Sequence, residues 1–227
     1  KQDKATRERL LNGNWNYDDN PYALIEFDKI VDLWTNNHVP TGERFITADV
    51  AGMGSDTFAI YVWSGWRVIH VEQLAKNDGE NGVRLINDLK KRFRVPNSNI
   101  TYDADGIGSY LRGYFPGARP FVNNSAALKG ENFKNLKAQC YFRLAERIND
   151  GGVYIEFEMD SKTRERLIEE LEQVQRDPGN DDGKLRLVAK EIIKNTIGRS
   201  PDLSDAMAFR VIFELTNKTQ SKRLSFI

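Results

Sequence analysis

The 227-residue chain carries 33 basic and 33 acidic side chains, so its net charge is near zero and nucleic-acid binding would require a local basic face. One cysteine excludes an intramolecular disulfide and, with two histidines, cannot build a standard zinc cluster. No apolar run approaches the length of a membrane span. Because the chain starts at Lys1 instead of Met, we expect a fragment of a longer protein.

Residues 1–43 differ from the rest and are predicted to form a helical arm and linker. Ala5–Leu11 has a short helical pattern, and a second helix is expected to begin at Asn20 and Pro21 and to run to about Trp34. This arm either packs on the main domain or ends an upstream domain.

Residues 44–227 are predicted to form the main domain. Its strands are expected at Phe45–Val50, Thr57–Trp63, Trp66–Gln73, Asn99–Asp103, Ala118–Val122 and Val153–Phe157, the last of them at an edge. Its helices are expected at Gly79–Phe93, Ser109–Tyr114, Lys134–Asn149, Lys162–Arg176 and from about Ser200 to Leu215, with an extended piece at Lys184–Ala189. A three-strand meander followed by alternating helices and strands predicts an α/β fold, with a mixed sheet and helices on both faces.

Aspartates stand beside apolar residues at the ends of three predicted elements. Asp49 ends the first strand and Asp103 the fourth, with Asp105 two residues further on. Asp202 and Asp205 share one face of the last helix, which is apolar nearly all round, so Asp205 should be buried and should need a partner. Converging carboxylates without His or Cys suit Mg²⁺ or Mn²⁺, and two such ions can activate water for phosphodiester hydrolysis.

Each aspartate also has a structural interpretation. Asp49 could accept hydrogen bonds from the glycine-rich turn Gly52–Ser55. Asp103 to Gly106 could be an ordinary Asp-Gly turn. Asp202 lies in a first helical turn, where the helix dipole favours an acid. The three places taken together favour a metal site.

Basic residues directly precede the last helix, and they could contact phosphates near the acids or form a solvated surface. Lys190 follows an extended apolar run and is the preferred candidate, and the others are Lys184, Arg186, Lys194 and Arg199.

Three segments together resemble the nuclease domain of phage terminase large subunits. They are Asp49 on a first strand followed by a hairpin, Tyr102–Gly108, and Gly198–Ala206 with its acid-x-x-acid-Ala pattern. Arg9–Trp15 also resembles the run that joins the terminase motor to its nuclease, so the resemblance covers nearly the whole chain. It implies a ribonuclease-H-like sheet of five to six strands, related to that of Holliday-junction resolvases.

The resemblance further implies a two-metal endonuclease that cuts concatemeric double-stranded DNA during packaging in the host cytoplasm. Asp49, Asp103, Asp202 and Asp205 would be catalytic and would bind two Mg²⁺ or Mn²⁺ ions, with Asp105 supporting them and Lys190, Lys194 and Arg199 contacting DNA. An ATPase domain upstream of residues 1–43, a small terminase subunit and a portal protein would be its partners, without a membrane. The alternatives are a resolvase or transposase-like nuclease on this fold, or a degenerate assembly domain.

Overall fold

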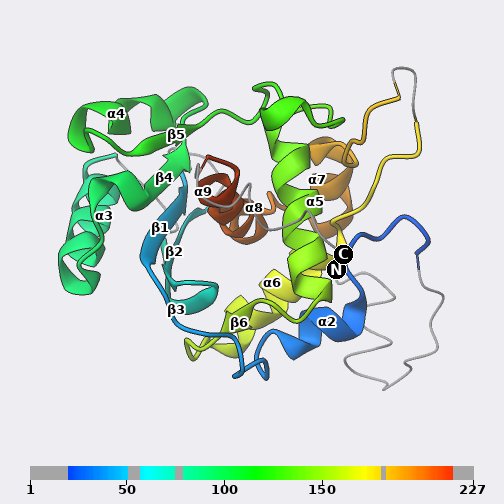
Figure 1. Ribbon diagram of the computed structural model, residues 1–227, viewed down its shortest axis with the longest axis horizontal. Coiled ribbons are helices and arrows are strands. Elements are labelled where there is room, and N and C mark those ends of the chain that lie inside the picture. Colours follow the sequence, from blue (N-terminus) through cyan, green and yellow to red (C-terminus); the bar gives the residue numbers. More distant parts are fainter. Residues whose placement is uncertain (1–19, 51–56, 75–78, 180–182, 217–227) are drawn as a thin grey trace, which may run out of the picture.

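The computed structural model describes residues 20–50, 57–74, 79–179 and 183–216. Within these ranges the centre is a six-stranded sheet in the order β5-β4-β1-β2-β3-β6 (Figure 1). Its strands are β1 (Arg44–Asp49), β2 (Phe58–Ser64), β3 (Arg67–Leu74), β4 (Ile100–Asp103), β5 (Arg119–Phe121) and β6 (Tyr154–Ile155). The first three strands form an antiparallel meander, β4 and β5 run parallel to β1, and β6 is parallel to β3 at the edge. The predicted mixed sheet is confirmed.

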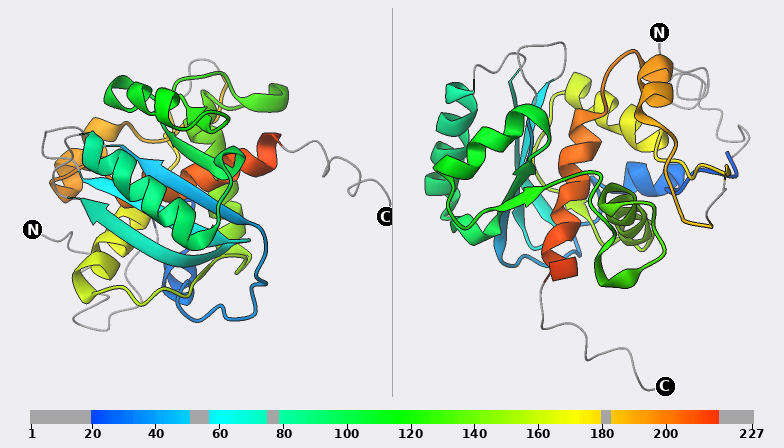
Figure 2. Two further views of the ribbon diagram at one scale, coloured as in Figure 1. Left: turned by 90° about the vertical axis from the view of Figure 1, so that its left-hand side faces the viewer. Right: turned by 90° about the horizontal axis from the view of Figure 1, so that it is seen from above.

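Helices cover both faces of this sheet (Figure 2). One face is covered by α3 (Glu80–Phe93) and α4 (Leu111–Tyr114), and the other by α5 (Leu136–Asn149), α6 (Ser161–Glu172) and α8 (Asp202–Ala208). The remaining helices are α2 (Phe27–Asp32), α7 (Lys190–Ile197) and α9 (Ile212–Thr216). Single 3-10 turns lie at Asn97–Asn99, Gly106–Tyr110, Leu128–Gly130 and Phe209–Val211. None of the described helices is long and apolar enough to cross a membrane.

Alternation along β1 divides the core into two parts. Ile46 and Ala48 belong to the core on the α3 side, whereas Phe45 belongs to the core formed with α5, α6 and α8. Successive side chains of a strand point to opposite faces, so Thr47 and Asp49 share the face of Phe45. The same reasoning places Asp103 on the α8 face, because Ile100 and Tyr102 lie in the α3-side core.

The arm was predicted only in part. Residues 20–26 are not helical, because Leu24 N–H donates to Val174 O and Asn149 Nδ2 donates to Leu24 O, which ties this stretch to the ends of α5 and α6. The short helix α2 that follows buries Phe27 and Ile30 in the main core, so this part of the arm packs on the main domain.

The extended piece at Lys184–Ala189 is confirmed by isolated bridges at Leu185 and Leu187, but α7 was not predicted. Gly198 ends α7 in a left-handed conformation that a glycine adopts without strain. The predicted helix at Ala5–Leu11, the motor-linking run Arg9–Trp15 and the turn Gly52–Ser55 lie outside the described residues.

Gly108 offers a test of how closely the chain approaches itself behind β4. A Cβ at Gly108 would lie 1.7 Å from Asp103 O, a backbone atom, whereas a Cβ at Gly113 would meet nothing within 4 Å. Gly108→Ala should therefore lower the free energy of unfolding by about 3 kcal/mol or more, and Gly113→Ala should raise it by up to about 1 kcal/mol because α4 gains helix propensity. Chemical denaturation measures both variants, and equal stabilities would contradict the close approach.

Candidate functional site

The ends of β1 and β4 bring two of the aspartates together. These strands are parallel and pair Ala48 with Tyr102, so the next residues, Asp49 and Asp103, lie at the same level of the sheet. Both point to the α8 face by the alternation described above. Asp49 is only 6% exposed, whereas Asp103 is partly buried.

The first turn of α8 supplies the other two aspartates. Asp202 and Asp205 are both buried, and α8 packs directly on β1 and β2. Thr57 N–H donates to Asp202 Oδ2 at 2.7 Å, which joins the start of α8 to the residue before β2. Ala59, two residues further along, pairs with Asp49 across β1 and β2, so this contact brings Asp202 to the end of the sheet that carries Asp49 and Asp103. We call Asp49, Asp103, Asp202 and Asp205 the acid cluster.

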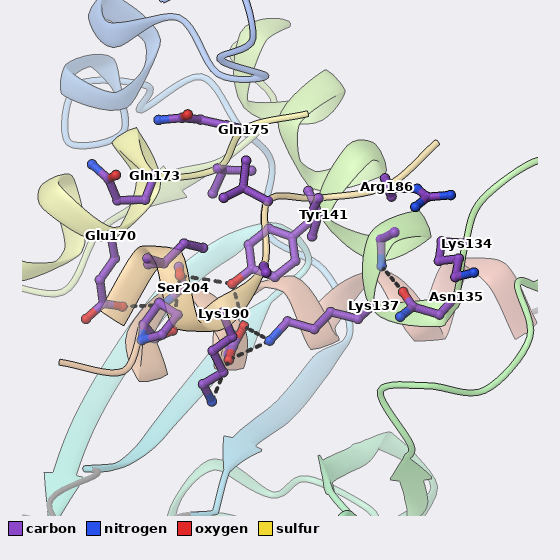
Figure 3. Close-up of a pocket in the computed structure, with 18 of the residues that line it drawn as sticks. Lys134, Asn135, Lys137, Tyr141, Glu170, Gln173, Gln175, Arg186, Lys190 and Ser204 are labelled. Carbon is purple, nitrogen blue, oxygen red and sulfur yellow. Dashed lines mark hydrogen bonds and ion pairs between the residues drawn. The ribbon is translucent and has the colours of Figure 1, made fainter. Parts of the chain in front are cut away.

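Asp205 is bound from two other helices. Tyr141 Oη on α5 donates to Asp205 Oδ1 at 2.6 Å, and Lys137 Nζ lies 2.7 Å from Oδ1 and 2.8 Å from Oδ2. Lys190 Nζ, at the start of α7, lies 3.6 Å from Oδ2 (Figure 3). The sequence prediction that Asp205 is buried and paired is thus confirmed, and its nearest cationic partner is Lys137.

Asp103 and Asp105 are held by a residue beyond the next strand. Asp105 N–H donates to Asp103 Oδ1 at 2.8 Å in a turn, so the strand ends at Asp103 and Asp105 is exposed. Asn123, after β5, donates through Nδ2 to Asp105 Oδ2 at 2.8 Å and to Asp103 Oδ1 at 3.3 Å. Asp105 therefore orients the strand end from outside the buried cluster.

The carboxylates differ in how readily they ionise. Burial, followed by the negative charges of Asp205, Asp202 and Asp103, raises the pKa of Asp49 well above its ordinary value. Burial also raises the pKa of Asp103. For Asp205 burial acts in the same direction, but Lys137 and Lys190 outweigh it and bring the pKa of that carboxyl below its ordinary value. Among the described residues, negative charge is therefore compensated more fully beside α5 and α7 than at the strand ends.

The oxygen-only donor set fits a hard divalent cation in its chemistry, because a cation would relieve the repulsion that raises the pKa of Asp49. Among the described residues, however, no group of three or more His, Cys, Asp or Glu side chains is arranged to hold a metal ion as it stands. At Asp205 the Lys137 ammonium lies against both carboxylate oxygens. A metal ion at Asp205 would have to displace it.

The predicted basic residues lie in different surroundings. Lys190 lies beside Asp205, as described, and Lys194 is one turn further along α7. Arg199 instead pairs with two carboxylates of α6, Glu169 at 2.5 Å and Glu170 at 3.6 Å. The structure thus gives Arg199 an internal role, and its contact with DNA stays a prediction.

Glu170 is a buried acid that the sequence argument did not single out. Its Oε2 accepts a 2.9 Å hydrogen bond from Ser204 N–H on α8, and its Oε1 is buried with no hydrogen-bond partner among the described residues. Burial raises the pKa of Glu170 to about 8, against the opposing effects of the Ser204 hydrogen bond and Arg199.

Sequence reasoning also missed Lys137, Tyr141 and Asn123. A signal for the first two was present, since Lys137, Tyr141, Leu144 and Ile148 share one helical stripe. A lysine within a stripe that faces the core requires an anionic partner. Asn123 lies in a polar loop and gave no comparable signal.

The strand order, with an antiparallel β1–β3 meander and β4 and β5 parallel to β1, is that of a ribonuclease-H-like fold, which solved terminase nuclease domains share. No protein-family model matches the chain, and no curated protein matches it.

Solved structures identify that fold more closely. The nuclease domain of the large terminase subunit gp2 of bacterial virus Sf6 is 23% identical, with a TM-score of 0.71 over 83% of this chain and 97% of that chain. A variant of that domain, solved with manganese and beta-thujaplicinol, has a TM-score of 0.72 at the same identity and coverage. The large terminase nuclease from thermophilic phage G20c with bound magnesium is 15% identical, with a TM-score of 0.57 over 85% of this chain and 97% of that chain. At these identities the likeness shows a shared fold.

Glu170 predicts a specific dependence of stability on pH. In the folded protein Glu170 keeps its proton until the pH reaches its pKa of about 8, whereas in the unfolded chain its pKa is the ordinary 4.5. The stabilisation that this group contributes is therefore fully present below pH 4.5. It is lost as the pH rises from 4.5 through 8, by about 1.4 kcal/mol for each unit by which the two pKa values differ. Glu170→Gln keeps an acceptor for Ser204 and should remove this fall.

Chemical denaturation of wild type and Glu170→Gln at pH 5 and pH 8.5 measures the difference. Glu165→Gln, at an exposed position on the same helix, is the matched control and should follow wild type. Parallel pH profiles for wild type and Glu170→Gln would show that Glu170 does not titrate in this window.

Proposed function

We propose that this chain is the metal-dependent endonuclease domain of a viral DNA-packaging terminase and cuts concatemeric double-stranded DNA in the host cytoplasm. The observation that supports the proposal is the position of Asp49 and Asp103 at neighbouring strand ends, with α8 and its Asp202 and Asp205 packed against β1, in a fold that terminase nuclease domains share. Its partners would be an ATPase domain, a small terminase subunit and a portal protein.

The proposed ligands of two Mg²⁺ or Mn²⁺ ions are Asp49, Asp103, Asp202 and Asp205. When bound, such ions supply Lewis acidity that activates water and stabilises the leaving oxygen of a phosphodiester. The chain itself contributes positions in its fold: two carboxylates on the neighbouring strands β1 and β4, and two on α8, which packs on β1 and β2. Asn123 and Asp105 orient Asp103, and Thr57 N–H fixes Asp202.

The cationic side of the cluster is suited to the DNA backbone. Lys190 is 40% exposed at its side chain and lies beside Asp205, so its ammonium can contact a phosphate while remaining near the acids. Lys194 and Arg199 are the further candidates for phosphate contacts. Such contacts carry little sequence information, so the proposed nuclease should have low sequence specificity.

Replacing Asp49 tests the nuclease. Asp49→Asn should lower Mn²⁺-dependent nicking of plasmid DNA by about a hundredfold or more, since loss of a direct ligand should cost at least as much as loss of its supporting partners. The fold should persist, because a neutral amide is less costly to bury than a charged carboxylate. Asp88→Asn, at an exposed position on α3, is the matched control and should cut normally. Undiminished nicking by Asp49→Asn would overturn the assignment.

A second candidate function is a domain whose acids serve structure and assembly alone. The observation that favours it is the ion pair between Lys137 and Asp205, which already neutralises one member of the cluster. The two functions differ in what Lys137 does, because a nuclease would need the lysine to give way to a metal ion.

A resolvase on the same fold would be distinguished by a preference for four-way junctions over linear duplex.

Lys137→Met separates these candidates. Without metal the variant should lose up to about 3 kcal/mol of stability, because the buried Asp205 loses its nearest cation. In a nuclease, Mn²⁺ should bind the variant more tightly than wild type and restore its melting temperature, as calorimetry and thermal unfolding would measure. Lys162→Met, exposed on α6, is the control. Absence of Mn²⁺ binding to both wild type and Lys137→Met at millimolar concentration would favour the structural function.

A further inference from the structure

A pocket of about 320 Å³ lies beside the acid cluster, among α5, the end of α6, residues 186–189, α7 and the start of α8 (Figure 3). Asp205, Lys137 and Lys190 form part of its wall, together with Tyr141 and Ser204. The pocket is therefore continuous with the site at which phosphodiester cleavage is proposed.

The rest of the pocket wall combines apolar surface with amide side chains. Its apolar part is formed by Ala138, Val174, Leu187, Val188, Ile193 and Pro201. Gln173 and Gln175 line it near Glu170, and Asn124 and Asn135 line it near Lys134. An amide both donates and accepts hydrogen bonds, and apolar walls with a few converging polar groups are typical of sites for small organic ligands.

The charge of the wall favours an anion. Four cationic side chains, Lys134, Lys137, Arg186 and Lys190, face two carboxylates, Asp205 and Glu170. Asp205 is already paired with Lys137, and Glu170 holds its proton to about pH 8 because burial raises its pKa. Cationic side chains therefore outnumber carboxylates on the wall, which favours an anion beside Lys137 and Lys190.

We propose that this pocket binds one unpaired nucleotide of the DNA strand, adjacent to the phosphate that the acid cluster would cleave. This inference rests on the proposed nuclease function. The nucleotide's phosphate would lie by Lys137 and Lys190, and its base between Ile193 and the amides of Gln173 and Gln175. A volume of about 320 Å³ is at the small end of the range for sites of organic ligands, which suits one nucleotide better than a base pair.

The binding mode has a consequence for the DNA. The base must leave its stack, which costs least where the duplex is mismatched or already open. The proposed nuclease should therefore prefer locally unpaired DNA over perfect duplex, without reading a sequence.

The pocket can be tested without metal or cleavage. In EDTA, calorimetry should show that deoxynucleoside 5′-monophosphates bind about tenfold or more tightly than either inorganic phosphate or deoxyadenosine, a difference of at least about 1.4 kcal/mol. Ile193→Trp should fill the pocket and weaken this binding about tenfold or more. Ile192→Trp, one residue earlier on α7 at a position that is 58% exposed, should bind as wild type does.

A second measurement does not depend on any variant folding. In wild type, nucleotide-induced shifts of backbone amide NMR signals should concentrate at residues 187–193 and at the start of α5. Any one of three results would overturn the proposal. The signal shifts could lie elsewhere in the chain. The affinity for phosphate could equal that for the nucleotides, or folded Ile193→Trp could bind nucleotides as tightly as Ile192→Trp.

Plasmid nicking with Mn²⁺ reports on the proposed function separately. Metal-dependent nicking by a protein that binds no mononucleotide would overturn the pocket and leave the nuclease. Mononucleotide binding without nicking would overturn the nuclease and the place of the nucleotide beside a cleaved phosphate.

Discussion

The carboxylate of Asp205 lies where α5, α7 and α8 meet, and the arrangement of the site depends on how it is paired. Tyr141 and Lys137 reach it from α5, and Lys190 from α7. A buried carboxylate without such partners would be strongly destabilising, so these contacts hold the three helices in register with one another. Because α8 also packs on β1 and β2, the same contacts fix the position of Asp202 relative to Asp49.

This pairing divides the site into two electrostatic halves. At the strand ends, burial and neighbouring acids destabilise the ionised forms of Asp49 and Asp103 and raise their pKa values. A cation would stabilise these ionised forms. On the α5 and α7 side, lysines exceed carboxylates, and an anion would be stabilised there. A DNA phosphodiester bound with divalent cations would supply the cations for the strand ends and the anion for the lysine side. The proposed cleavage site and the proposed nucleotide pocket therefore form one continuous surface.

Lys137 lies between the two electrostatic halves of the site. Its ammonium lies against both oxygens of Asp205, so a metal ion that used those oxygens would have to displace it. The sequence argument held that a buried Asp205 requires a partner, and this was correct in its physics. The cation in the structure is a lysine 68 residues earlier in the chain, which weakens any argument for a metal from burial alone.

The sequence by itself determined the strands, most of the helices and the buried position of Asp205, because each follows from periodicity within one element. The apolar pattern around Asp205 required burial whatever packed against it. By contrast, residues 20–26 had a helical pattern but are held in another conformation by Val174 and Asn149. Tertiary structure alone decided which lysine pairs with Asp205, that Asn123 orients Asp103, that Arg199 turns inward to α6, and that a pocket lies beside α7. Those contacts join residues far apart in the chain, and local sequence patterns carry no information on which distant residue will supply a partner.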